Sequence, residues 1–168
     1  MTKKILVIAL LFILNNCSLT PLYKANHENY DVLAAVDLHS VTGEKNHILR
    51  SYLLSSLNPN NIQTKKTFKL DISVSQAIGD TLVQKDSTTS QSDMIVTAVF
   101  SLRAIKDDKE IKSGTIKVVT NFEDNLSSYA SFSQRNKAYE VGLKEIVRSI
   151  KSHILIALLN KNYIVNED

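Results

Sequence analysis

The chain has 168 residues, 43% of them hydrophobic and 22% charged, which fits one soluble domain with an ordinary apolar core. Its formal charge is +3, but residues 1–16 contain Lys3, Lys4 and no acidic residue, so 18 basic and 17 acidic residues remain beyond them. Nucleic-acid-binding domains carry a marked basic excess, so this balance excludes nucleic acid as an expected partner. Cys17 is the single cysteine and cannot form an intramolecular disulfide.

Residues 1–16 are predicted to be a lipoprotein signal peptide. Lys3 and Lys4 are followed by ten apolar residues, Ile5 to Leu14. This run is too short for a membrane-spanning helix, which takes about 20 residues, but it has the length and basic flank of a secretory signal. The alternative is a buried core helix or strand, which rarely combines an extreme N-terminal position with a basic start and no polar face.

Cys17 follows the apolar run at the place where such a signal would be cleaved. Leu14 fits the lipobox position three residues before the cysteine, whereas Asn15 and Asn16 replace the small residues that usually stand there. A free buried cysteine is the competing interpretation. Lipidation would attach two or three acyl chains, which anchor a protein stably where one chain does not. Ser18 after the cysteine, in place of an aspartate, favours the outer membrane.

Three further segments are predicted beyond the signal. Residues 17–30 form a polar, lipidated tether, residues 31–160 form one domain, and residues 161–168 form a polar tail that frays. No internal repeat or linker indicates a second domain.

The first half of this domain alternates between strand and helix patterns. Alternating apolar residues predict a strand at 30–38, which Thr42-Gly43 then breaks. Helical spacing predicts a helix at 44–57, ended by Asn58-Pro59 because the residue before proline avoids the α region. Strict alternation predicts a half-buried strand at 67–76.

The second half predicts further strands and a closing helix. Residues 77–91 are polar and can extend two strands into a long hairpin whose tip lies near Lys85. Residues 93–105 are apolar on both faces, which predicts a central strand, and residues 110–122 predict a fourth strand. A long helix with one apolar stripe is expected at about 131–160.

The predicted order is therefore β-α-β-β-β-α. The helix between the first two strands predicts a right-handed crossover that makes them parallel, and the short links between the last three predict an antiparallel meander. Two helices packed on one face of a four-stranded mixed sheet would bury all the apolar faces at once. The fold class expected is α+β.

The sequence shows no catalytic or metal-binding pattern. Its histidines fall in separate predicted elements, and there is no P-loop, nucleophile elbow or ligand spacing typical of a metal site. Asp107-Asp108 is interpreted as a turn and His153 as a helix-packing residue. We expect no enzymatic activity, no metal and no cofactor apart from the covalent diacylglycerol and N-acyl lipid on Cys17.

Several stretches resemble the lipopolysaccharide-assembly lipoproteins of the LptE family. The segment CSLTPLY, which begins at Cys17, is similar to the mature start of the family, Cys-Gly-Phe-x-Pro-Leu-Tyr, with Ser18 and Leu19 in place of Gly and Phe. Three more stretches resemble its first helix, long hairpin and closing helix in the same order: residues 47–59, 68–102 and 127–158. The resemblance covers nearly the whole chain beyond residue 16.

The resemblance implies a lipoprotein held in the inner leaflet of the outer membrane of a Gram-negative cell, facing the periplasm. Members of the family plug the lumen of the β-barrel LptD, assist its assembly and bind lipopolysaccharide on its way to the outer leaflet. Lys85 has a position similar to a basic residue implicated in that binding. The second basic position of the family falls on Ser133, and Arg135 is the candidate to replace it.

Lipopolysaccharide is anionic, so basic side chains are the expected contacts. Lys69, Arg103 and Lys117 are expected to share the outward face of the sheet. Two other functions stay open from the sequence alone. One is a generic periplasmic envelope lipoprotein that acts as a ligand-binding or scaffold module, and the other is an enzyme with a site that no motif reveals.

Overall fold

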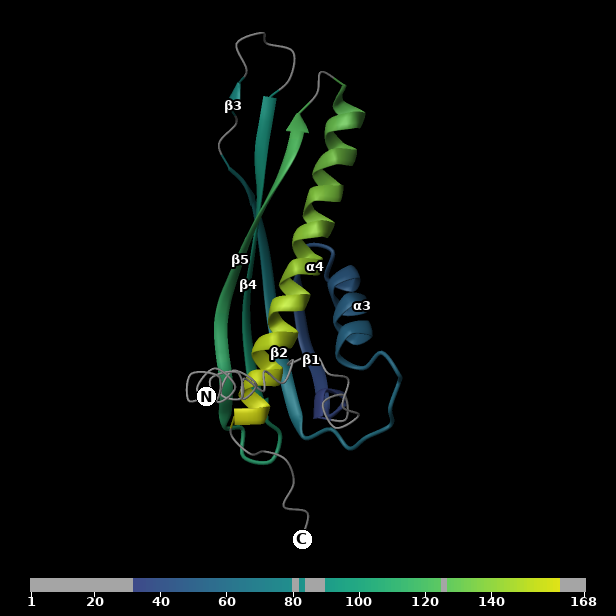
Figure 1. The fold of residues 1–168 in the computed structure, drawn as a ribbon, viewed down its shortest axis with the longest axis vertical. Helices are drawn as coiled ribbons and strands as arrows, with labels where there is room; N and C mark the ends of the chain where they lie inside the picture. Colours follow the sequence, from purple (N-terminus) through teal and green to yellow (C-terminus); the bar gives the residue numbers. More distant parts are fainter. Residues whose placement is uncertain (1–31, 80–81, 84–89, 125–126, 161–168) are drawn as a thin grey trace, which may run out of the picture.

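The computed structural model describes residues 32–79, 82–83, 90–124 and 127–160. Its elements are β1 (Val36–Gly43), α3 (Asn46–Leu57), β2 (Phe68–Ile78), β3 (Leu82–Val83), β4 (Ser90–Ala104), β5 (Glu110–Asp124) and α4 (Ser128–Asn160) (Figure 1). β1 pairs with β2 in parallel, and β4 pairs antiparallel with β2, β3 and β5. β2 and β3 pair with successive parts of the same side of β4 and so share one position in the sheet. The sheet is therefore four strands wide and mixed, as predicted.

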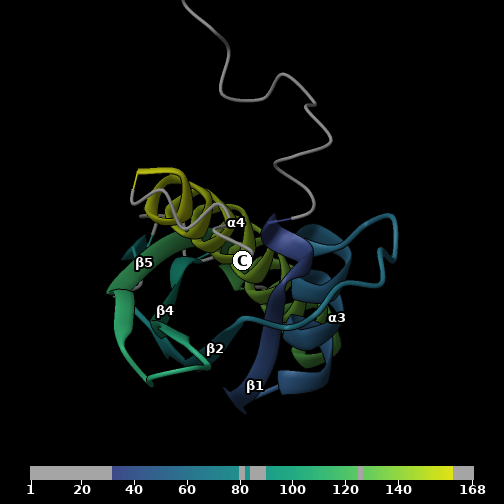
Figure 2. The same cartoon turned by 90° about the horizontal axis from the view of Figure 1, so that it is seen from below.

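Both helices lie on one face of this sheet (Figure 2). The α3 helix buries Leu49, Leu53 and Leu57 beside β1 and α4. The predicted apolar stripe of α4 is confirmed, and these residues of it are buried against the sheet: Leu143, Ile146, Val147, Ile150, Ile154 and Leu158. Residues at alternate positions of β2 and β4 supply the other side of one continuous core. Burial of the two helical faces and one sheet face therefore accounts for the layered α+β fold.

The first strand differs from the expectation of residues 30–38. Residues 32–34 form a helical turn, and β1 runs from Val36 to Gly43. Ala34 is buried and Val32 half-buried within that turn rather than through strand pairing, so the alternation of these residues misplaced the strand. A β-bulge between Leu38 and Ser40 then shifts the phase, so that Val41 packs against the core.

Gly43 ends β1 at a position that favours glycine. Its φ of 122° lies in the region that other residues rarely adopt, and a β-carbon there would clash with the carbonyl oxygen of Val74 on β2. The break predicted at Thr42-Gly43 therefore marks the end of the strand. The α3 helix follows after a two-residue turn at Glu44 and Lys45.

The β4 strand is the central strand of the sheet, as its apolar residues on both faces predicted. It pairs over its whole length, with β2 and β3 on one side and β5 on the other. The α4 helix lies close to it at Gly142, where a β-carbon would lie 2.7 Å from Cγ2 of Val96. The absence of a side chain at Gly142 therefore lets the helix lie close to the strand.

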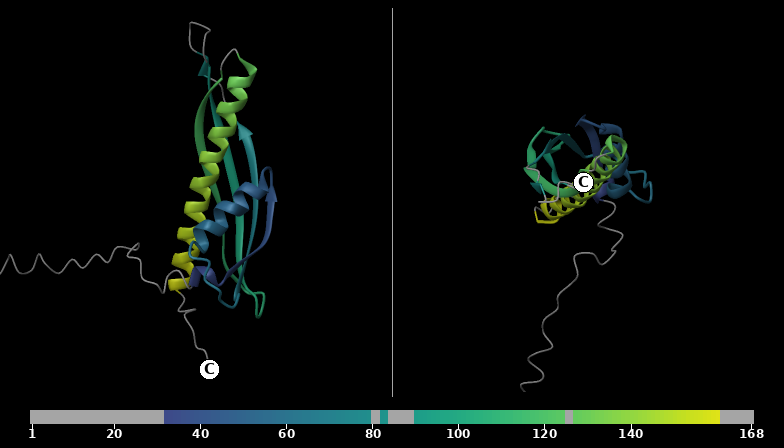
Figure 3. Two further views of the ribbon diagram at one scale, coloured as in Figure 1. Left: turned by 90° about the vertical axis from the view of Figure 1, so that its right-hand side faces the viewer. Right: turned by 90° about the horizontal axis from the view of Figure 1, so that it is seen from above.

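The helices and strands differ in how far they extend along the long axis of the domain. β1 and α3 accompany only part of the sheet, whereas β4, β5 and the first half of α4 continue beyond them (Figure 3). We call the end with β3 and the start of α4 the distal end. The proximal end carries the turn between β4 and β5 and the last residues of α4, up to Asn160.

Substitution of Gly142 tests the close approach of α4 to β4. Gly142→Ala should lower the free energy of unfolding by about 1 kcal/mol, because overpacking costs about 1–3 kcal/mol and the better helix propensity of alanine offsets about 1. Val96→Ala removes the atom that clashes, so the two substitutions together should destabilise less than the sum of the single changes. Urea unfolding of the four proteins measures this coupling, and additive effects would show that no such contact exists.

Candidate functional site

The predicted site residues fall in different parts of the chain. Cys17 and Lys85 lie outside the described residues, whereas Arg135 lies on α4. The hairpin stem on either side of residues 84–89 is described, because β3 pairs with Ser90 and Gln91 at the start of β4. The same two residues pair with the last residues of β5. The hairpin stem, the end of β5 and the start of α4 therefore meet at the distal end (Figure 1).

Arg135 is held against the sheet at this end. Its guanidinium carbon lies 5.7 Å from the centroid of the buried Phe122 ring on β5. A guanidinium over an aromatic face is stabilised by about 0.5–2 kcal/mol, depending on how far it is desolvated. Its Nε is buried without a hydrogen-bond partner among the described residues. Arg135 is therefore a partly buried, positioned cation rather than a freely projecting one.

Ser133 lies on another face of α4 from Arg135. It lines a shallow hollow of about 310 Å³ together with Tyr129, Phe132, Asn136, Lys137 and Glu140. Lys137 stands four residues after Ser133, a spacing that places both on the same helix face, whereas Arg135 stands only two residues away. Lys137 is therefore the cation beside Ser133, and the i, i+4 spacing was the signal in the sequence that could have identified it.

Two aromatic side chains that border this hollow are exposed to solvent. Tyr129 is 82% exposed and Phe132 is 63% exposed, unusual values for large apolar rings on a helix that buries its other side. They lie in the first turns of α4, on the face that turns toward α3 further along the helix. The distal end thus combines exposed aromatic rings with Lys137, an arrangement suited to a ligand that is both apolar and anionic.

A hydrogen-bonded cluster fixes this helix face in position. Lys45 donates to Oδ1 of Asn136 over 2.8 Å, and its Nζ lies 5.6 Å from the ring centroid of Tyr139. The Tyr139 hydroxyl donates to the carbonyl of Glu44 over 2.8 Å, and Gln76 on β2 donates to the Glu44 carboxylate. Burial, and secondly the charge of Glu44, raise the pKa of Tyr139. The turn between β1 and α3 is thereby tied to both α4 and β2.

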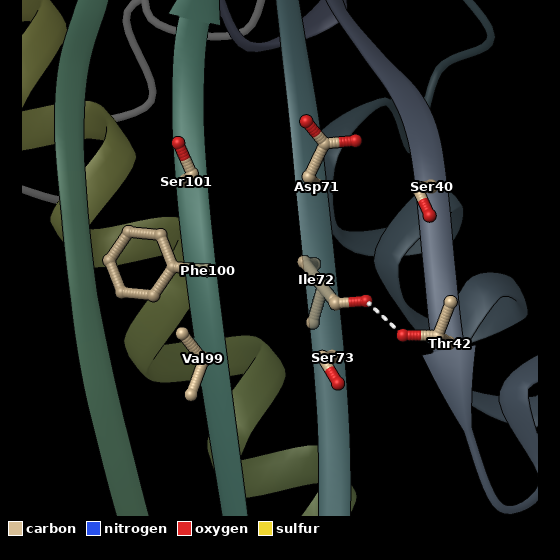
Figure 4. Close-up of a pocket in the computed structure, with 8 residues that line it drawn as sticks. All are labelled: Ser40, Thr42, Asp71, Ile72, Ser73, Val99, Phe100 and Ser101. Atoms are coloured by element: carbon tan, nitrogen blue, oxygen red, sulfur yellow. Dashed lines mark hydrogen bonds between the residues drawn. The ribbon is translucent and has the colours of Figure 1, made fainter.

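The outward face of the sheet carries small polar side chains. A shallow hollow of about 300 Å³ is lined there by Ser40, Thr42, Asp71, Ser73, Val99 and Ser101, with the neighbouring Ile72 and Phe100 (Figure 4). The Thr42 hydroxyl donates to the carbonyl of Ile72 over 3.4 Å. These groups can bind water or hydroxylated ligands.

The described residues form neither a metal-binding cluster nor a membrane-spanning helix. They contain no group of three or more His, Cys, Asp or Glu side chains arranged to hold a metal ion. In the same part of the chain, no helix combines the length and the apolar character needed to cross a membrane.

The three basic residues expected on the outward face do lie there. Lys69 and Arg103 are cross-strand neighbours near the proximal end, and Lys117 pairs with Thr97 further along. The Asp108 carboxylate lies 2.7 Å from Nζ of Lys69 and 3.8 Å from Nη1 of Arg103. The hydrogen bond from Lys69 and then its charge lower the pKa of Asp108. Two of the three cations are therefore already paired.

Comparison with known proteins establishes the fold. No family profile and no curated protein matches the sequence. Among solved structures, a candidate lipoprotein from Caulobacter crescentus is 18% identical with a TM-score of 0.63 and covers 80% of this chain and 97% of that one. A minor lipoprotein from Acinetobacter baumannii is 14% identical with a TM-score of 0.55, covering 75% and 93%. The rare lipoprotein B from Shewanella oneidensis is 15% identical with a TM-score of 0.50, covering 76% and 95%. The chain therefore has a fold that is also found in bacterial lipoproteins, and a shared fold does not fix the activity.

The ionic cluster at the proximal end predicts a pH dependence. Because the pKa of Asp108 is lowered in the folded protein, its contribution to stability is complete above the ordinary aspartate pKa of about 3.9 and is lost as the pH falls through the folded value. Asp108→Asn should therefore unfold at slightly lower urea than the parent at pH 7, and this difference should shrink as the pH falls below about 3.9. Asp107→Asn is the control, because Asp107 accepts from the Lys109 amide and forms no salt bridge with another described residue. An unchanged difference between Asp108→Asn and the parent across this range would exclude the ion pair as its cause.

Proposed function

We propose that the chain is an outer-membrane lipoprotein of lipopolysaccharide transport and assembly, which plugs an LptD-type β-barrel and binds lipopolysaccharide with its distal end. The observation that carries the proposal is the meeting of the hairpin stem around Lys85 with the exposed face of α4 at one end of the molecule. The order of elements that resembles the LptE family is the order found in the fold. Cys17 would carry the lipid that attaches the tether to the inner leaflet.

The shape and surface of the domain are compatible with a place inside a barrel. The α4 helix has 33 residues, about 50 Å at 1.5 Å per residue, and lies along a sheet only four strands wide. The outward face of that sheet carries hydroxyl and charged side chains in its middle and proximal parts. Large membrane barrels have a polar interior, so a long narrow domain with a polar sheet face suits such a lumen.

The distal end supplies the chemistry for a phosphorylated, acylated glycolipid. Lys85, Lys137 and Arg135 are the candidates for its phosphate groups, since charged donors make the stronger hydrogen bonds to phosphate. Tyr129 and Phe132 can contact its apolar or sugar parts. The second candidate is a generic envelope lipoprotein that binds another ligand or acts as a scaffold, which the hydroxyl-lined hollow of the outward face favours.

Affinity purification tests the barrel partner. The tagged full-length chain, extracted from membranes in detergent, is expected to bring down one large outer-membrane β-barrel in a stoichiometric amount. Cys17→Ala is the control: it cannot be lipidated, so it should fold but leave the membrane fraction. A chain that stays monomeric after crosslinking in intact cells would contradict the barrel plug. If Cys17→Ala remained in the membrane without the barrel, residues 1–16 would be acting as an uncleaved anchor.

Charge reversal tests the ligand. Lys85→Asp and Lys137→Asp should each weaken lipopolysaccharide binding by about tenfold, because each removes a charged donor and introduces repulsion. Lys117→Asp makes the same change of charge on the exposed outward face and should leave binding within about twofold. Titration of the Cys17→Ala chain with purified lipopolysaccharide measures the dissociation constants, and circular dichroism confirms folding. Equal losses of lipopolysaccharide affinity in all three variants would show that net charge alone causes the effect. They would contradict the assignment of the binding site to the distal end.

A further inference from the structure

One edge of the sheet is left open above the end of β1. β2 has 11 residues, but β1 pairs with it only from Phe68 to Val74. Beyond Val74, β2 continues through Ile78 with β4 on its other side. On the side of β1, the described part of the chain supplies no strand for these last residues. An open strand edge is a template for pairing with another polypeptide.

The register shows which backbone groups point to this open side. The amide of Ile105 donates to the carbonyl of Thr67 over 2.9 Å, and the amide of Gly79 donates to that of Asp93 over 2.8 Å. Odd-numbered residues of β2 therefore bond to β4, and even-numbered ones direct their N–H and C=O groups the other way. Gln76 and Ile78 thus present two donors and two acceptors about 7 Å apart, the repeat of a β-ladder.

The chain closes its neighbouring edge but leaves this one open. Nζ of Lys66 donates to the carbonyls of Ala34 and Val36 over 2.7 and 3.3 Å, and Nη1 of Arg50 donates to that of Leu38 over 3.1 Å. Basic side chains therefore occupy the outer carbonyls of β1, which prevents a further strand from pairing there. The opposite edge strand, β5, has α4 packed against it (Figure 2).

The residues around the open edge indicate which kind of ligand could bind there. Its floor is the turn at Lys45, which is tied to Asn136 on α4, while Gln76 on β2 is bonded to the adjoining Glu44. Above this floor, the Ile78 side chain is 49% exposed. Lys45 is the cation of this floor, and the Glu44 carboxylate next to it is already engaged by Gln76. An occupant with apolar side chains and one acidic group therefore complements the surface.

We propose that Gln76 and Ile78 form a docking edge for an extended segment of a partner polypeptide, which adds a strand to the sheet beyond the end of β1. The segment carries apolar side chains at alternate positions, which pack toward Ile78, and an acidic residue that meets Lys45. Lipids and glycans do not match this edge, because they lack donors and acceptors that alternate at the spacing of a strand. The inference does not depend on the lipopolysaccharide-binding role of the distal end.

A synthetic peptide tests the docking edge directly. The probe is acetyl-Asp-Val-Thr-Val-Thr-Val-amide, added at up to about 1 mM to the ¹⁵N-labelled chain carrying Cys17→Ala. We expect saturable binding that slows hydrogen exchange of the Gln76 and Ile78 amides by about tenfold or more. Ile78→Lys should abolish binding, because a charge at the edge blocks strand addition. Val119→Lys is the matched control: Val119 on β5 has the same 49% exposure, and binding should be unchanged.

Modified peptides separate strand pairing from other binding. A peptide N-methylated at alternate residues keeps its side chains but loses half of its donors, so it should not bind. Replacing its Asp by Lys should weaken binding several-fold, about 1 kcal/mol. Equal binding of the methylated peptide, no binding of the parent peptide at about 1 mM, or Gln76 and Ile78 amides already protected in the isolated protein would each overturn the proposal. Protection that rises with protein concentration alone would assign the edge to a second copy and overturn it too. The assay contains neither barrel nor lipopolysaccharide, so its failure leaves the proposed function to its own tests.

Discussion

The packing of α4 along β4 and β5 is the contact on which the rest of the structure depends. The β4 and β5 strands extend beyond β1 and α3, and an unsupported pair of long strands is only marginally stable in water. The helix continues alongside them, with Gly142 close to Val96 and the Arg135 guanidinium over the Phe122 ring. The distal end therefore exists as an ordered two-layer structure because one long helix supports it, without help from the elements that complete the lower part of the fold.

Much of this architecture could be predicted from periodicity, because the apolar residues that repeat are those that the layers bury. The strand beginning at Phe68 and the stripe of α4 follow this rule. It failed where local backbone geometry decides: residues 32–34 form a helical turn that buries the adjacent Leu33 and Ala34, and the bulge after Leu38 reverses the phase of β1. No pattern in the sequence fixes such a bulge, since it depends on the pairing partner.

The candidate site divides in the same way. Lys85 could be placed near a hairpin tip, and the described stem agrees with a hairpin around it. The sequence offers Arg135 as the candidate because it stands two residues after Ser133, whereas helix geometry places Lys137 on the face of Ser133. The exposure of the Tyr129 and Phe132 rings could not be predicted from the sequence. It arises because α3 accompanies only part of α4 and leaves these two rings uncovered. The cations of the outward face likewise could be located, but their pairing with Asp108 depends on a turn in space.

Gly43 determines the length of the open edge of β2. Because the positive φ of this residue stops β1 opposite Val74, it determines how many residues of β2 stay available above it. Moving the glycine by two positions would lengthen or shorten that interval by one ladder repeat, while the core beneath Val74 kept its side chains. The length of the open edge and the packing of the core therefore depend on different positions of the chain.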